Sequence, residues 1–122
     1  MGRLRILIAE RRSRVRFALR TLLQQHDWLE VVGEAADAEG LMAQVQANCP
    51  DVVLLDWDLP GMVATSSVAT VHQICPNLMV IVLSGRPGQK QAALQAGADV
   101  FLSKMERPEQ LLQILQKKGE KR

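Results

Sequence analysis

The most apolar run of the chain is the short segment at residues 52–55, which ends at Asp56. Pro50 precedes the run, and Pro60 and Gly61 follow it. A β-branched and leucine run between such turn residues predicts a strand that is buried on both faces. Strands of this kind belong to parallel sheets that helices cover on both sides. Asp56 is therefore expected at the carboxyl edge of a sheet, where open α/β folds place their binding crevice.

The rest of the chain repeats the same order of strand and helix. Strands are predicted at residues 4–9, 31–35, 52–56, 78–83 and 99–102. Helices are predicted at residues 13–26, 37–49, 65–74, 89–96 and 108–118. Five alternating units predict an α/β fold with a doubly wound, five-stranded parallel sheet in the flavodoxin-like order 2-1-3-4-5. One domain is expected over residues 1–118, with residues 119–122 as a C-terminal tail or the stub of a linker.

Composition excludes several classes of protein. A chain of 122 residues with 48% hydrophobic residues is long enough for one domain with its own core. No apolar run approaches the roughly 20 residues that span a bilayer, and we expect no signal peptide in the first residues. The net charge of +2 is too small to indicate nucleic-acid binding. Cys49 and Cys75 have no metal-type spacing, so we expect reduced thiols in a cytoplasmic protein.

Positive charge is concentrated at the start of the chain. Seven arginines fall within the first twenty residues, where Glu10 is the only acid. Two interpretations remain open for this cluster: a solvated helix face, or a docking surface for an acidic partner.

Four predicted strands end in polar residues that the fold would bring to one crevice. Glu10 follows the first strand, Asp56 ends the third, Ser84 follows the fourth and Lys104 follows the fifth. These residue types suit phosphoryl transfer onto a carboxylate. Asp56 would be the nucleophile, and Lys104 and Ser84 would bind the phosphoryl oxygens. Neighbouring carboxylates would hold Mg²⁺, which prefers oxygen ligands.

These residues carry a resemblance to a known family, the receiver domain of bacterial two-component response regulators. The likeness covers the whole chain, and its segments occur in the family's order: residues 5–9, 51–56, 59–62, 80–84, 96–99 and 102–104. It implies that Asp56 is the phospho-acceptor, assisted by Lys104 and Ser84. It also implies that Ser84 and Phe101 form the switch, and that helix four, strand five and helix five form the output face.

The resemblance further implies a metal site and partners. Glu10, Asp56 and the backbone carbonyl of Asp58 would bind the metal. The partner would be a histidine kinase or a phosphotransfer protein, with an output domain in a longer parent chain or a homodimer as further partners. No direct contact with nucleic acid or membrane is expected. The domain would not be an enzyme beyond promoting its own phosphorylation and dephosphorylation.

One departure from the family concerns the metal. Its second acidic residue, the principal metal ligand, is replaced by Arg11. Two hypotheses remain open: the domain accepts phosphate with impaired Mg²⁺ binding, or Arg11 replaces the cation in a phosphorylation-independent interaction module. The expected cofactor is thus Mg²⁺ that is weakly held or absent.

Two further residues are expected to modulate the crevice. Trp57 is predicted at its lip. Asp58 and Arg86 lie two residues beyond Asp56 and Ser84, and the sequence leaves open whether they pair across its mouth. A rival class, a flavodoxin-like enzyme or cofactor domain, would need a glycine-rich phosphate loop after the first strand. Residues 10–13 are instead charged and contain no glycine.

Overall fold

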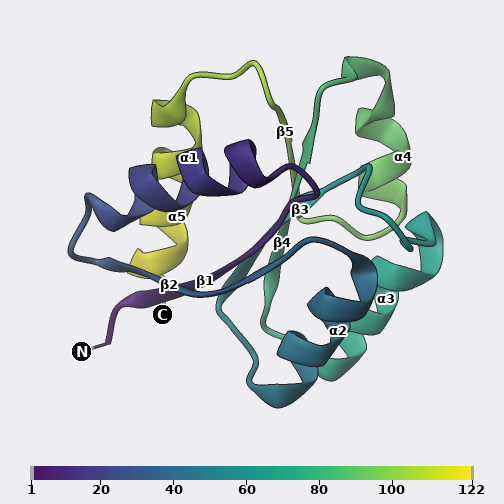
Figure 1. Ribbon diagram of the computed structural model, residues 1–122, viewed down its shortest axis with the longest axis horizontal. Helices are drawn as coiled ribbons and strands as arrows, with labels where there is room; N and C mark the ends of the chain where they lie inside the picture. Colours follow the sequence, from purple (N-terminus) through teal and green to yellow (C-terminus); the bar gives the residue numbers. More distant parts are fainter. Residues whose placement is uncertain (1, 122) are drawn as a thin grey trace.

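A five-stranded parallel sheet forms the centre of the molecule, as a computed structural model shows (Figure 1). The structure describes residues 2–121, without the side chains at positions 64 and 65. The strands are β1 (Leu4–Ala9), β2 (Leu29–Ala35), β3 (Val52–Asp56), β4 (Met79–Ser84) and β5 (Val100–Ser103). Their order is β2-β1-β3-β4-β5, so the predicted topology is confirmed. Over the described residues, no helix is long and apolar enough to cross a bilayer.

Five α-helices alternate with the strands. They are α1 (Ser13–Gln24), α2 (Ala38–Ala47), α3 (Ala64–Ile74), α4 (Lys90–Gln95) and α5 (Pro108–Glu120), and a short 3₁₀ turn, η1 (Pro87–Gln89), precedes α4. The prediction that the last helix stops near residue 118 was wrong, because α5 continues through Gly119. A Cβ at Gly119 would meet open space. This glycine therefore lies within the last turn of α5 and does not cap the helix.

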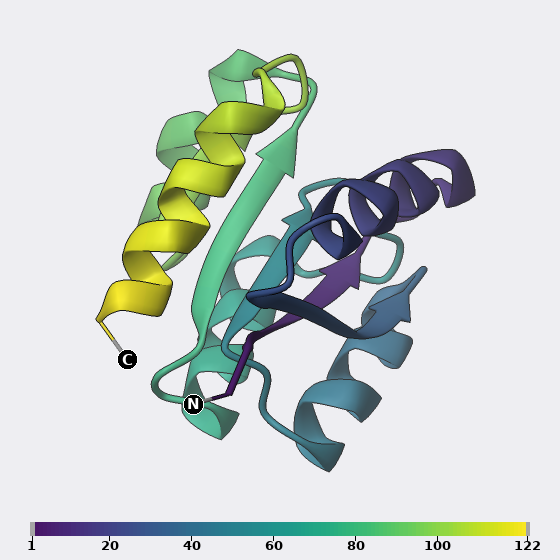
Figure 2. The same cartoon turned by 90° about the vertical axis from the view of Figure 1, so that its left-hand side faces the viewer.

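The helices divide into two layers, and each layer closes one core. Helices α1 and α5 cover one face of the sheet, and α2, α3 and α4 cover the other (Figures 1 and 2). Alternate residues of β3 point into opposite cores: Val52 and Leu54 pack with Leu111 and Leu115, whereas Val53 and Leu55 pack with Leu41, Val45, Val68 and Val71. All five β3 residues are buried, as the apolar run predicted. A strand buried on both faces is held in register, because any slip would expose apolar side chains.

The strand register brings the polar ends of the strands to one edge of the sheet. Asp56 at the end of β3 lies opposite Leu83 of β4, and Ser84 at the end of β4 lies opposite Ser103 of β5. Because all five strands are parallel, the loops that follow them lie at this same edge. Glu10 lies in the loop after β1, and Lys104 lies in the loop after β5. The fold thus builds the predicted crevice from four separate loops.

Glycine is needed at the turn that ends α4. Gly97 has a φ of 108°, in the region that side chains rarely adopt, and it follows the last turn of the helix as predicted. A Cβ there would also lie 3.5 Å from a methyl group of Val68 and 3.8 Å from the ring of His72. The turn after α4 therefore packs directly on α3.

The expectation of two reduced thiols was wrong, because Cys49 and Cys75 form a disulfide. Cys49 lies in the loop between α2 and β3, and Cys75 directly follows α3. Helices α2 and α3 lie side by side on the same face of the sheet (Figure 1), which brings the two loops together at the amino edge. Sequence spacing carried no sign of this pairing, since 26 positions separate the two cysteines.

Candidate functional site

Asp56 lies at the centre of the crevice and is fully buried. The backbone N–H of Asp58 donates to its Oδ1 at 2.9 Å, and the backbone N–H of Arg11 donates to its Oδ2 at 3.2 Å. Both donors belong to the turns that follow β3, the central strand, and its neighbour β1. The sheet order is therefore what positions these donors around the carboxylate.

Lys104 joins the two buried carboxylates. Its Nζ lies 3.1 Å from Asp56 Oδ1 and 2.7 Å from Glu10 Oε1. The Glu10 contact is an ion pair without hydrogen-bond geometry, because no donor is aligned on the buried Oε1 atom. The other carboxylate oxygen of Glu10 accepts the backbone N–H of Arg12 at 2.7 Å. The predicted convergence of Glu10, Asp56 and Lys104 is thus present in the structure.

Arg11 points into the crevice. Its Nε lies 3.4 Å from Asp56 Oδ2, and its terminal nitrogen lies 3.9 Å from Asp58 Oδ2. The side chain remains 37% exposed, so it covers the carboxylates from the solvent side. The sequence left this orientation undetermined, and the structure places the guanidinium beside the phospho-acceptor of the predicted reaction.

Arg86 closes the mouth of the crevice. Its guanidinium donates to Asp58 Oδ1, so the pairing of Asp58 with Arg86 that the sequence left open is present. Two guanidinium groups therefore contact the Asp58 carboxylate. Arg86 reaches it from the β4–α4 loop, and Arg11 reaches it from the β1–α1 loop. Such an exposed pair contributes little to stability, typically below about 1 kcal/mol, but it restricts the entrance.

The surroundings of Asp56 favour its ionised form. Burial by itself raises the pKa of a carboxyl group, because it removes water from the charge. Two backbone N–H donors, from Asp58 and Arg11, and the Lys104 ammonium outweigh that effect and hold the pKa of Asp56 below its ordinary value of 3.8. Asp56 is therefore a carboxylate at neutral pH, as a nucleophile or an ion-pair partner requires.

We expect this lowered pKa to make stability depend on pH in acid. A carboxyl group with a depressed folded-state pKa contributes stability above its ordinary pKa, and the contribution is lost as pH falls through the folded-state value. Urea unfolding of the wild type should therefore weaken more steeply below pH 3.8 than unfolding of an Asp56→Asn variant. Parallel curves for the two proteins would show that Asp56 titrates as it does in the unfolded chain.

The crevice residues do not fit a divalent cation in this arrangement. Mg²⁺ needs free oxygen ligands in near-octahedral geometry. Each carboxylate already faces a cation: Glu10 and Asp56 share Lys104, and Asp56 and Asp58 share Arg11. Over the described residues, no three His, Cys, Asp or Glu side chains gather in a metal-binding arrangement. The guanidinium of Arg11 lies beside the carboxylates of Asp56 and Asp58.

Ser84 and Phe101 occupy neighbouring strands. Ser84 is fully buried, and its hydroxyl accepts the backbone N–H of Arg86 at 3.0 Å. Phe101 on β5 is half-buried against the core that α2, α3 and α4 cover. The Lys104 backbone N–H donates to the Ser84 carbonyl at 2.8 Å, which ties the loop that carries the lysine to the end of β4. The roles of Ser84 and Phe101 in switching stay predictions.

Trp57 does not lie at the lip of the crevice, where the sequence analysis placed it. The residue is only 9% exposed and packs in the core between the sheet and α2, α3 and α4. Its indole N–H donates to Gln89 Oε1 at 3.2 Å, which connects the residue after Asp56 to the start of α4. The period-two alternation of β3 carries past Asp56, and this puts Trp57 on the inner side.

Sequence reasoning missed Arg16 as part of the site. Its guanidinium donates to the backbone carbonyl of Glu10 at 2.6 Å and also lies 3.6 Å from Glu34. Arg20 pairs with the same Glu34 at 2.6 Å, so the two arginines share one carboxylate. The only sequence signal was their spacing of one turn on α1, and Glu34 lies on the following strand, β2.

Comparison with known proteins agrees with this geometry. The family model described as the response regulator receiver domain matches residues 6–116. The transcriptional regulatory protein YhcZ of Bacillus subtilis is 34% identical over 118 residues, which cover 95% of this chain and 55% of YhcZ. A protein-glutamate methylesterase of Cereibacter sphaeroides is 37% identical over 106 residues, 84% of this chain and 29% of that enzyme. The chain therefore spans about half or less of these curated relatives.

Solved structures show the same fold. The signal receiver domain of NarL from Mycobacterium tuberculosis superposes with a TM-score of 0.88 at 27% identity, over the full length of both chains. RcsB from Salmonella enterica superposes with a TM-score of 0.82 at 27% identity, over 95% of this chain and 61% of RcsB. That structure contains RcsB bound to promoter DNA. The family match, the sheet order and the crevice lead to the same conclusion: this chain belongs to the response regulator receiver domains.

Proposed function

We propose that this receiver domain works as an interaction module in which Arg11 replaces the metal cation and holds the crevice in one state without phosphorylation. The observation that carries the proposal is the 3.4 Å approach of Arg11 Nε to Asp56 Oδ2, with the same side chain 3.9 Å from Asp58. A planar guanidinium can contact two carboxylates at once, as Arg11 does here.

The contacts of Asp56 explain why phosphoryl transfer would be slow. Lys104 and the Asp58 N–H engage Oδ1, while both the backbone and the side chain of Arg11 engage Oδ2. A nucleophilic oxygen must be free to approach phosphorus in line with the leaving group. The Arg11 side chain would have to swing outward before Oδ2 could react.

A second candidate function is supported by Lys104 and Ser84. These residues and Asp56 lie at three neighbouring strand ends, in the positions that the family uses to accept a phosphoryl group from a histidine kinase. Under this hypothesis, Ser84 and Phe101 would transmit the change to the face formed by α4, β5 and α5. The domain would then respond to phosphate with poor metal assistance.

The contact surface of the module is inferred to include α1. Phe17 is 53% exposed on this helix, and the guanidinium of Arg20 lies 5.4 Å from the centre of its ring. Arg14 is exposed on the same helix, and Arg12 is exposed directly before it. An exposed aromatic ring among arginines suits a partner with acidic side chains around an apolar anchor.

The relatives suggest a larger context. YhcZ is a transcriptional regulatory protein, and RcsB was solved bound to promoter DNA. We infer that this receiver controls an output domain in a longer parent chain, and that any contact with DNA is made by that output domain. A histidine kinase or phosphotransfer protein remains the proposed upstream partner.

Incubation with acetyl phosphate and Mg²⁺ separates the two candidate functions. We expect the intact mass of the wild type to show no phosphoryl adduct, with Asp56→Asn as the matched control. An adduct that appears in the wild type and disappears in the control would overturn the phosphate-independent proposal and support the second candidate. Circular dichroism of both proteins would exclude misfolding as the reason for a negative result.

A further inference from the structure

The backbone around Cys49 and Cys75 is held by contacts that do not depend on the disulfide bond. Hydrogen bonds that do not involve sulfur hold both residues: the Cys75 N–H donates to the Val71 carbonyl at 2.9 Å, and the Cys75 carbonyl accepts the Leu78 N–H at 3.1 Å. The Cys49 carbonyl accepts Arg5 at 2.8 Å. The Cα atoms lie 5.7 Å apart, within the usual range for a disulfide. Reduction should therefore leave the two thiols close together.

The two members of the pair differ in exposure. Cys49 is exposed, whereas Cys75 is only 3% exposed. A dissolved thiol or disulfide reaches an exposed cysteine first, and the buried partner then resolves the mixed disulfide. The two residues are also the only cysteines in the sequence, so no other pairing competes within one chain.

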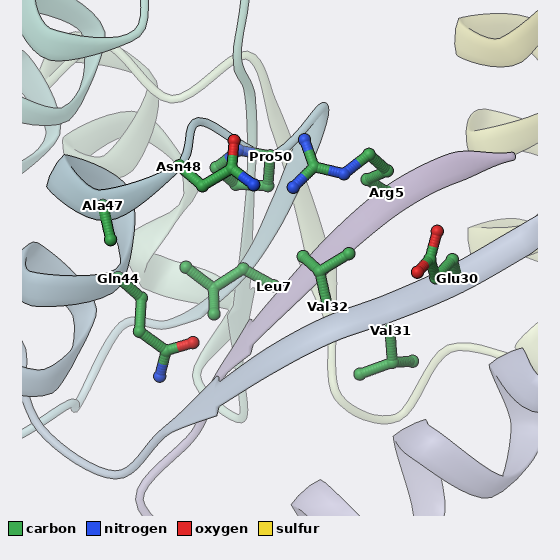
Figure 3. Close-up of a pocket in the computed structure, with 9 residues that line it drawn as sticks. All are labelled: Arg5, Leu7, Glu30, Val31, Val32, Gln44, Ala47, Asn48 and Pro50. Carbon is green, nitrogen blue, oxygen red and sulfur yellow. The ribbon is translucent and has the colours of Figure 1, made fainter. Parts of the chain in front are cut away.

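Arg5 brings a positive charge to the Cys49 loop. Figure 3 shows its guanidinium pointing toward Asn48 and Pro50, the residues on either side of Cys49. Arg5 also lines a hollow of about 520 Å³ beside this loop, at the amino edge of the sheet and therefore opposite to Asp56. The hydrogen bond from Arg5 to the Cys49 carbonyl fixes the backbone of this loop.

Helix α3 connects the cysteine pair to the turn between α4 and β5. His72 lies one turn before Cys75, and its ring nitrogen is 3.0 Å from the carboxylate of Asp99, which also accepts the Val80 N–H at 2.7 Å. Asp99 directly precedes β5, and Gly97 in the same turn packs against His72. Closing the disulfide therefore anchors the end of the helix that supports the turn between α4 and β5.

We propose that Cys49 and Cys75 form a thiol–disulfide exchange site for low-molecular-weight disulfides of the glutathione class, and that its state sets the mobility of the turn between α4 and β5. The Cys49 thiolate attacks one sulfur of the external disulfide, whose S–S bond breaks and releases one thiolate. The Cys75 thiolate then attacks the Cys49 sulfur and releases the second. The two cysteine protons pass to the released thiolates, so one external disulfide becomes two thiols as the protein pair is oxidised.

Titration of the folded full chain tests the exchange. The protein is equilibrated in buffers of reduced and oxidised glutathione, quenched with acid, alkylated and read by intact mass. We expect a single two-thiol transition with the fold retained. A Cys75→Ser variant should accumulate a glutathione adduct on Cys49, whereas Cys49→Ser should accumulate little on the buried Cys75. A pair that becomes reducible only when the chain unfolds would overturn the proposal, as would equal adducts in both variants.

Amide hydrogen exchange tests the connection to the α4–β5 turn. Reduction of the wild type should speed exchange at residues 72–75 and 97–99 by several-fold and leave β3 unchanged. A Cys49→Ser/Cys75→Ser variant should show the fast rates in either buffer. Unchanged rates at residues 97–99 on reduction would show that the disulfide is a static brace, and that result would overturn the proposed connection. Neither experiment depends on Arg11 or on phosphorylation of Asp56.

Discussion

Replacing Arg11 with aspartate is expected to raise the affinity for Mg²⁺ at least about tenfold and to allow phosphorylation of Asp56. At about 5 Å and an effective dielectric constant near 20, a divalent cation and a unit charge interact by about 7 kcal/mol before solvent screening. The substitution replaces that repulsion with attraction, and about 1.4 kcal/mol of the difference is enough for a tenfold change. Tryptophan fluorescence during a Mg²⁺ titration measures the affinity, because Trp57 directly follows Asp56.

Two controls make this result specific. A Trp28→Phe background removes the second indole, which lies 37% exposed near the amino edge of the sheet. Arg14→Asp applies the same charge change three residues further on, at an exposed position in the first turn of α1. We expect it to alter Mg²⁺ affinity by no more than about twofold because the charge is screened. Equal gains in Arg11→Asp and Arg14→Asp would show that overall charge controls the site, and not the guanidinium beside Asp56.

Removal of the disulfide is expected to lower the free energy of unfolding by about 3 kcal/mol. Cys49 and Cys75 close a loop with a sequence separation of 26, and a crosslink of that span restricts the unfolded chain by roughly this amount. For a domain of this size the loss corresponds to a melting temperature about 10 °C lower. Urea unfolding of Cys49→Ser/Cys75→Ser, compared with the oxidised wild type, measures the difference.

The reduced wild type is the matched reference for that variant. It keeps both cysteines and lacks only the crosslink, so its stability should fall close to that of the double serine protein. If the reduced protein were as stable as the oxidised one, the disulfide would contribute nothing, and the variant's loss would have to come from burying a serine in place of Cys75.

The site was predictable from sequence because strand ends are easy to find. The run that ends at Asp56, and the polar residues after three other strands, are local features of the printed sequence. Parallel strands of an alternating fold place their carboxyl ends at one edge, so local features sufficed to gather Glu10, Asp56, Ser84 and Lys104. The same strand ends left a pairing of Asp58 with Arg86 open, and the structure contains that pair across the mouth of the crevice.

Side-chain direction was less accessible to sequence reasoning. Arg11 follows β1 at a position from which a long side chain can reach either the solvent or the crevice. The direction depends on which carboxylates lie near the side chain, and those belong to other strands. Trp57 was expected at the surface because the residue after a strand usually begins a turn. It is buried because the core beneath α2, α3 and α4 offers apolar contacts and Gln89 offers a partner for its N–H group.

The sequence by itself determined the order of strands and helices, the two-faced burial of β3 and the residues that meet at the carboxyl edge, because these follow from periodicity and turn residues along the chain. The tertiary structure alone decided that Arg11 turns inward onto Asp56, that Arg16 and Arg20 share Glu34, and that Cys49 bonds Cys75. Each of these contacts joins residues from different elements, and their separation is set by how the helices pack on the sheet, which no local pattern records.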